Sequence, residues 1–255
     1  MRLLVTRPEA DAGRLMAELA RCGHEAVMAP LMDIHHFEDA ELPKRAAGHD
    51  WQAILITSAN GARALAARSE AGSLKDVPVF AVGRASAEAA SAAGFTNVRS
   101  ADGDVEALAD LVGSELEPEA GPLLHVAGSV TAGDLQVMLG VKGFEVARAV
   151  LYEARAAKIL PDTAHAALEA RDVDGVLLYS PRTARLFMSL VRAADLDGTL
   201  AGIEAFCLSD AVAHEAGGEA ENAFFRAVHV ADRPEQAALI ELVNKVAGEG
   251  RDGLT

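Results

Sequence analysis

The two halves of this 255-residue sequence resemble each other, but their matching segments follow one another in a different order. Residues 3–31 align with residues 123–151 at an offset of 120, with ten identical positions. The shorter matches pair residues 54–65 with 176–187, 80–90 with 206–216, and 98–102 with 228–232. Such a repeat predicts two similar units of roughly 120 residues, each large enough for its own core. Because ligand sites favour domain interfaces, it also predicts a cleft between the two units.

Short aliphatic or β-branched runs alternate with stretches rich in Ala and Leu that have a helical period. We expect ten strands, five in each unit, at residues 3–6, 25–29, 53–57, 79–82, 97–99, 123–127, 145–150, 175–179, 205–208 and 227–230. Gly23, Gly94 and Gly143 each follow a predicted helix, where glycine commonly ends helices. The alternation predicts α/β lobes with parallel sheets covered by helices on both faces, and five strands per lobe indicate the flavodoxin-like order.

The order of the predicted strands indicates that the second lobe is inserted in the first. Two strands precede residues 31–37, and the next five strands, which end at Val150, make a complete set. We therefore assign residues 1–34 and 153–255 to a discontinuous lobe one, and residues 36–150 to an inserted lobe two. The chain crosses between lobes at residues 31–37 and 148–154, which we expect to form a two-strand hinge.

The charge and composition narrow the classes of partner. A formal net charge of −15 argues against nucleic acid or an anionic membrane as a general partner. It does not exclude an anionic small ligand, because arginines and backbone N–H groups can reverse the local sign. No apolar run approaches the roughly 18 residues of a membrane span. Because a predicted strand begins at residue 3, we expect no targeting segment. Since Cys22 and Cys207 form no pair motif, we expect a reducing, cytoplasmic location.

The sequence lacks the motifs of several common chemistries. It contains no GxGxxG motif, no P-loop and no GxSxG motif. His35 and His36 lie in a hinge segment with no cysteine or carboxylate at metal-ligand spacing, so we interpret them as solvated hinge residues. We therefore expect no metal and no cofactor.

Candidate binding residues follow six of the predicted strands. In open parallel sheets, ligands bind beyond the carboxyl ends of the strands, where helix N-termini offer free N–H groups to anions. The turns at these ends carry hydroxyl, amide, Gly or Arg residues. The candidates are Thr6, Arg7, Ser58, Asn60, Gly83, Arg84, Ser86, Gly128, Ser129, Ser180, Arg182 and Ser209. Ser, Thr and Asn are also ordinary N-caps, and a capping role is compatible with binding.

These residues and their spacing resemble the uroporphyrinogen-III synthase family along nearly the whole chain, to about Ala247. The segments that carry the resemblance are 5–8 (VTRP), 23–25 (GHE), 30–31 (PL), 55–61 (LITSANG), 81–87 (AVGRASA) and 178–181 (LYSP), with Tyr152 in the second hinge segment. Each motif alone is weak, whereas their order and spacing together are fairly specific. The family's fold of two hinge-linked lobes, one inserted in the other, agrees with the architecture predicted above.

The resemblance implies a substrate and a reaction. The substrate would be hydroxymethylbilane, a linear tetrapyrrole with eight carboxylates. Loss of water from ring A gives an azafulvene cation, ring D attacks it, and a spiro intermediate rearranges so that ring D is inverted. The resemblance thus implies a cofactor-free hydro-lyase of tetrapyrrole (haem, cobalamin and chlorophyll) biosynthesis. It further implies a monomer with, at most, transient contact with the preceding pathway enzyme.

The resemblance also implies roles for particular residues. Tyr152 matches the hinge-strand tyrosine proposed to help the hydroxyl leave, which a phenol would do by hydrogen bonding. An amphipathic hinge tyrosine without a catalytic role is the alternative. Thr6, Arg7, Ser58, Ser86, Ser180 and Ser209 match cleft positions expected to hold carboxylates. For Arg7 the alternative is a structural ion pair.

Two turns depart from the family pattern. The turn at residues 209–212 (SDAV) lacks the paired threonines common there; Asp210 would repel a propionate, and Val212 cannot donate a hydrogen bond. The turn at residues 128–131 (GSVT) lacks the arginine-rich form.

Two other functions fit the same architecture. One is a non-catalytic function, in which the two-lobe protein binds a small ligand or has a regulatory role. The other is a glycosyl- or phosphoryl-transferring enzyme, which would need a nucleotide-binding turn or metal carboxylates that the sequence lacks.

Overall fold

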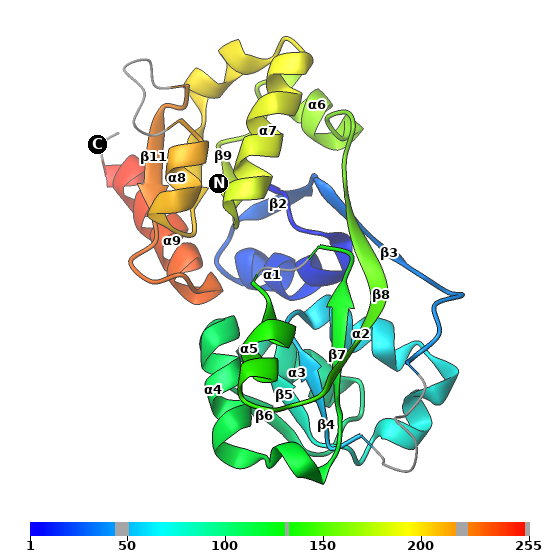
Figure 1. The fold of residues 1–255 in the computed structure, drawn as a ribbon. Helices are drawn as coiled ribbons and strands as arrows, with labels where there is room; N and C mark the ends of the chain where they lie inside the picture. The colour runs from blue at the N-terminus through cyan, green and yellow to red at the C-terminus, as the bar shows by residue number, and fades with distance from the viewer. Residues whose placement is uncertain (44–50, 131–132, 218–223, 253–255) are drawn as a thin grey trace. The chain divides into compact units, whose positions relative to one another are not determined.

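The computed structural model describes residues 1–43, 51–130, 133–217 and 224–252, with residues 250–252 described by their backbone alone. The chain divides into two compact units. Unit 1 comprises Met1–Asp33 and Arg155–Thr255, and unit 2 comprises Ile34–Ala154. Each unit is built around one sheet with helices on both faces (Figure 1), which confirms the predicted α/β class.

The sheet of unit 1 is parallel and has the predicted flavodoxin-like order. Its strands lie in the order β11 (Ala227–Val230), β10 (Glu204–Cys207), β9 (Gly175–Leu178), β1 (Arg2–Val5) and β2 (Glu25–Met28). Counted along this unit's own chain, the order is 2-1-3-4-5. Its helices are α1 (Glu9–Arg21), α6 (Asp162–Glu169), α7 (Pro181–Ala193), α8 (Asp210–Glu215) and α9 (Gln236–Asp252), with a short 3-10 helix at Asp197–Gly202.

The sheet of unit 2 has the same neighbours in a permuted chain order. Its strands lie in the order β3 (Met32–His36), β8 (Val146–Ala156), β7 (Leu123–Gly128), β4 (Ala53–Ile56), β5 (Val79–Ala81) and β6 (Val98–Ser100). The helices are α2 (Ala59–Ala66), α3 (Arg84–Ala92), α4 (Val105–Glu115) and α5 (Leu135–Val141), with 3-10 helices at Ser69–Leu74 and Pro118–Ala120. Without β3, the chain order is 3-2-1-4-5. It becomes the flavodoxin order when the count starts at β7 instead of β4.

The strand register follows the sequence repeat. In unit 1, Leu3 lies opposite Ala26, and in unit 2 the aligned residues Leu123 and Val146 lie opposite each other. The other three strand pairs of the repeat correspond in the same way. The two units therefore share one fold, and the shuffled order of the repeat is a circular permutation.

The central strands are buried on both faces, which explains why they appear in the sequence as continuous apolar runs. In unit 1, Leu15 of α1 and Val243 of α9 pack on one face of the sheet, and Phe187 of α7 packs in the core on the other. Gly23 and Gly143, equivalent in the repeat, end helices with φ of 77° and 91°. Because L side chains rarely adopt this conformation, glycine is favoured at both positions.

The residues that connect the two units form neighbouring strands. β3 lies beside β8 at the edge of the second sheet. Ala157 N donates to Leu31 O, and Phe37 N donates to Leu151 O, each at 2.9 Å. Residue numbers rise along one strand as they fall along the other, so the pair is antiparallel. A hinge at this pair stays a prediction. None of the helices in the described ranges combines the length and the apolar character that a membrane span needs.

Candidate functional site

Tyr152 lies where β8 leaves the regular register of β7. Ala127 pairs with Val150, but the next residue, Gly128, pairs with Tyr152, so β8 has an extra residue here. The tyrosine is 8% exposed, and its ring lies directly against Gly128: a methyl group added to Gly128 would come within 2.9 Å of Tyr152 Cζ. Ser129 N also donates to Tyr152 O at 2.9 Å. The tyrosine ring is therefore held at the carboxyl end of β7 by close backbone contact.

A buried histidine that sequence analysis did not select lies on β7, three residues before Gly128. His125 is 3% exposed, and neither ring nitrogen has a hydrogen-bond partner among the described residues. Burial lowers the pKa of His125 to about 4, and the charge of Arg148 on the neighbouring strand contributes to this shift. The imidazole is therefore neutral at pH 7. A polar residue within the apolar run LLHVA is the signal that sequence analysis could have used.

Two further turns of unit 2 place their candidates at helix N-termini. Ser58 caps α2, because its Oγ accepts a hydrogen bond from Asn60 N at 3.2 Å. The Asn60 side chain is engaged with Arg63, whose Nη1 donates to Asn60 Oδ1 at 2.7 Å. The capping role expected for such residues is thus present at this turn.

The turn after β5 is formed mainly by backbone. Gly83 precedes α3 in an extended conformation, Arg84 at the start of α3 is exposed, and Ser86 is 5% exposed. Ser86 N donates to Gly83 O at 3.1 Å. Arg84 is therefore the accessible side chain of this turn.

In unit 1 the hydroxyl of Thr6 links two strands. The residue is fully buried, and Oγ1 donates to Leu177 O of β9 at 2.7 Å. Ser180 caps α7, because its Oγ accepts from Thr183 N at 3.1 Å. Arg182 follows on the exposed first turn of the same helix. Ser209 precedes α8 and makes no side-chain capping bond within the described residues.

Arg7, at the carboxyl end of β1, is half-buried. Its Nη1 donates to Gln236 Oε1 at 2.9 Å, and its guanidinium carbon lies 4.6 Å from the centre of the Tyr179 ring. Among the described residues, no carboxylate forms an ion pair with Arg7. The alternative of a structural ion pair therefore finds no support among the described residues, and a binding role for Arg7 stays a prediction.

Parallel pairing brings the candidates of each unit to one edge of their own sheet. β1, β9 and β10 are neighbours, so Arg7, Ser180 and Ser209 follow adjacent strands of unit 1. In unit 2, Ser58 and Asn60 follow β4, the candidates of residues 83–86 follow the adjacent strand β5, and Gly128 and Ser129 lie at the end of β7 on the other side of β4. Each unit thus presents a row of strand-to-helix turns of the kind that binds anions.

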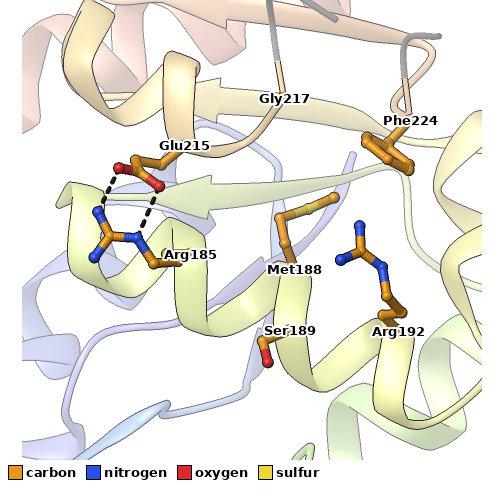
Figure 2. Close-up of a pocket in the computed structure, with 7 residues that line it drawn as sticks. All are labelled: Arg185, Met188, Ser189, Arg192, Glu215, Gly217 and Phe224. Atoms are coloured by element: carbon orange, nitrogen blue, oxygen red, sulfur yellow. Dashed lines mark hydrogen bonds and ion pairs between the residues drawn. The ribbon is translucent and has the colours of Figure 1, made fainter.

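A surface hollow of about 230 Å³ lies between α7 and α8 and includes none of the candidates (Figure 2). Arg185 and Glu215 are joined there by two hydrogen bonds, and Met188 and Phe224 form its apolar part. The volume is below the roughly 300 Å³ at which small-molecule pockets begin, which argues against a large ligand here. Within the described residues, no cluster of three or more His, Cys, Asp or Glu is arranged to hold a metal ion.

The fold and the turns together define a class of protein. It is an α/β protein of two units, and each unit has a row of polar turns that suit an anionic ligand. A family model described as "Uroporphyrinogen-III synthase HemD" matches residues 13–241. The chain therefore belongs to the uroporphyrinogen-III synthase family, which confirms the resemblance found in the sequence. A small-molecule tetrapyrrole substrate fits this family. No curated protein matches the chain in sequence.

Two solved structures share the fold over their whole length. Uroporphyrinogen-III synthetase from Helicobacter pylori superposes with a TM-score of 0.63 at 14% identity, covering 96% of this chain and 100% of that one. A mutant uroporphyrinogen III synthase from Thermus thermophilus has a TM-score of 0.52 at 16% identity, covering 97% of this chain and 99% of that one. At such low identity these structures support the fold and not individual residues.

Proposed function

We propose that this protein converts hydroxymethylbilane into uroporphyrinogen III, acting as a hydro-lyase without a cofactor. The observation that carries the proposal is the family match over residues 13–241. The turns at the carboxyl ends of the strands support it, because a ligand with eight carboxylates needs many hydrogen-bond donors. A hydrogen bond to a charged group contributes about 1.5–3 kcal/mol, so several such turns would add up to substantial binding.

In this proposal the main task of the protein is to hold the flexible bilane in one conformation. Without enzyme, the bilane closes without inverting ring D and gives isomer I. Binding the carboxylates at fixed turns would favour the conformation in which the substituted carbon of ring D attacks the cation. Positioning of this kind can supply a large part of a rate enhancement without strong acid–base catalysis.

Tyr152 is the proposed catalytic residue. Its phenol group would hydrogen-bond the ring A hydroxyl and help it to leave as water. Close contact with Gly128 supports this role, because a donor held in one orientation loses little freedom when it binds substrate. The candidates that accompany Tyr152 as proposed binding residues are Thr6, Arg7, Ser58, Asn60, Gly83, Arg84, Ser86, Gly128, Ser129, Ser180, Arg182 and Ser209.

We further propose a cytoplasmic monomer that makes, at most, transient contact with the enzyme that supplies the bilane. The free cysteines Cys22 and Cys207 support a reducing compartment.

The test is a coupled assay. Hydroxymethylbilane is generated in place, the protein is added, the products are oxidised, and the porphyrin isomers are separated by chromatography. An excess of isomer III over a sample with heat-denatured protein is the expected result. Isomer I alone, from a folded protein, would contradict the proposal and favour a non-catalytic ligand-binding protein on the same scaffold.

A further inference from the structure

The aromatic residue before Ser180 has a specific relationship to Arg7. Tyr179 is half-buried, and the guanidinium of Arg7 lies over its ring, 4.6 Å from the ring centre. By distance and angle, the Tyr179 hydroxyl is buried without a hydrogen-bond partner among the described residues, although Arg7 is near enough to act on the pKa of Tyr179 in the direction opposite to burial. An aliphatic side chain would fill this space without leaving a hydroxyl unpaired, but it would offer no π face to the cation.

A second residue fixes the edge of the same guanidinium. Gln236, at the start of α9, accepts a hydrogen bond from Arg7 at 2.9 Å and donates one from Nε2 to Glu18 Oε2 at 2.6 Å. Arginine can only donate and an ionised carboxylate can only accept. The amide of Gln236 is therefore held in one orientation between Arg7 and Glu18.

The charge of Arg7 is not neutralised by these neighbours. Burial raises the pKa of Tyr179, so its hydroxyl stays neutral. Burial would also raise the pKa of Glu18, but hydrogen bonds from Arg14 and Gln236 outweigh this effect and lower it. Glu18 is thus ionised, yet it pairs with Arg14 at 2.9 Å and reaches Arg7 only through the Gln236 amide.

We propose that Tyr179 and Gln236 are positioning residues, which hold the guanidinium of Arg7 ready to bind a carboxylate of the ligand. This inference rests on the proposed function, because it assumes a ligand with carboxylates. The ring of Tyr179 covers one face of the guanidinium, and Gln236 engages a single nitrogen, Nη1. The planar fork of arginine suits a carboxylate bound by two parallel hydrogen bonds.

The experiment compares four variants with the wild type in the coupled assay: Arg7→Ala, Tyr179→Leu, Tyr179→Phe and Gln236→Glu. Tyr179→Leu should raise KM about fivefold with kcat within about twofold, because the cation–π contact is lost. Tyr179→Phe keeps the ring and should restore the wild-type KM. Gln236→Glu should raise KM as Tyr179→Leu does, because the new carboxylate pairs with Arg7. This last change lies at a half-buried position, so it remains informative even if Tyr179→Leu fails to fold.

A binding measurement separates failure of this inference from failure of the proposed function. The probe is uroporphyrin III, a stable macrocycle with eight carboxylates, and the readout is fluorescence quenching at low and high salt. Arg7→Ala, Tyr179→Leu and Gln236→Glu should weaken binding mainly at low salt, where charge interactions are least screened. If the wild type makes no isomer III but the probe shows this pattern, the proposed function fails and the positioning role stands.

Two results would overturn the inference. One is that Tyr179→Leu and Gln236→Glu keep the wild-type KM and probe affinity, while Arg7→Ala raises KM and weakens probe binding. Arg7 would then bind the ligand without positioning residues. The other is a KM and probe affinity unchanged by Arg7→Ala, which would mean that Arg7 binds no carboxylate.

Discussion

The ring of Tyr152 lies against the backbone of Gly128 on the neighbouring strand, so closely that a side chain at residue 128 would have to displace the ring. A Cβ atom at Gly128 would lie 2.9 Å from Tyr152 Cζ and 3.2 Å from its hydroxyl oxygen. Cβ atoms in proteins essentially never approach another atom to 2.9 Å, so the ring would have to move. The position of the proposed catalytic phenol therefore depends on a residue with no side chain.

Gly128→Ala should displace the Tyr152 ring and lower turnover. Overpacking of this kind costs about 1–3 kcal/mol of stability. Gly140→Ala is the matched control, because a methyl group added there meets no atom within 4 Å and glycine in a helix is about 1 kcal/mol less favourable than alanine. For both variants, the melting temperature is measured by thermal unfolding and turnover is measured as the rate of isomer III formation. Equal turnover in the two would contradict the importance of this contact.

Tyr152→Phe should lower turnover by about tenfold or more while leaving the melting temperature close to that of the wild type, since the hydroxyl is removed and the ring still packs on Gly128. Tyr179→Phe serves as a control for the loss of a phenol elsewhere in the protein. Wild-type turnover in Tyr152→Phe would show that this tyrosine has no catalytic role.

His125 should make the protein less stable in acid. Its folded pKa of about 4 lies below the ordinary 6.5, so the unfolded state binds a proton that the folded state excludes. The contribution of His125 to stability is constant well above pH 6.5, becomes more unfavourable as the pH drops from 6.5 to 4, and levels off below 4. The loss is about 3 kcal/mol.

Urea unfolding at a series of pH values tests this expectation. His125→Leu should lose less stability than the wild type between pH 6.5 and 4. His165→Leu, at a histidine whose side chain is 45% exposed, serves as the control substitution. Parallel curves for His125→Leu and the wild type would show that His125 does not cause the acid sensitivity.

Thr6→Val distinguishes the structural from the binding role of this residue. The change keeps the shape and leaves Leu177 O without its buried donor, so it should cost about 1–3 kcal/mol of stability. The proposed binding role predicts that KM also rises, whereas a KM within about twofold of the wild type would show that the role of Thr6, which is fully buried, is structural alone. A large rise in KM at unchanged stability would instead support direct contact with the substrate.

Much of the architecture could be predicted because it depends on local patterns. Runs such as ILI and LLV indicate strands buried on both faces, and the offset between Leu3 and Leu123 marks residues that have equivalent partners in the two sheets. Capping by Ser58 and Ser180 follows from their position before a helix. These features require only that each residue is compared with its neighbours in the chain.

The contacts at the candidate site depend on the tertiary structure. The sequence placed Tyr152 in a hinge strand, but the extra residue that brings it opposite Gly128 is a property of two paired strands. Arg7 and Gln236 are 229 residues apart, and no periodic pattern connects them. Apolar periodicity determines which face of a strand or helix is buried. Which polar side chains meet at the end of a sheet is decided by the packing of the whole unit, because contacts of a few ångströms depend on how its elements are placed against one another.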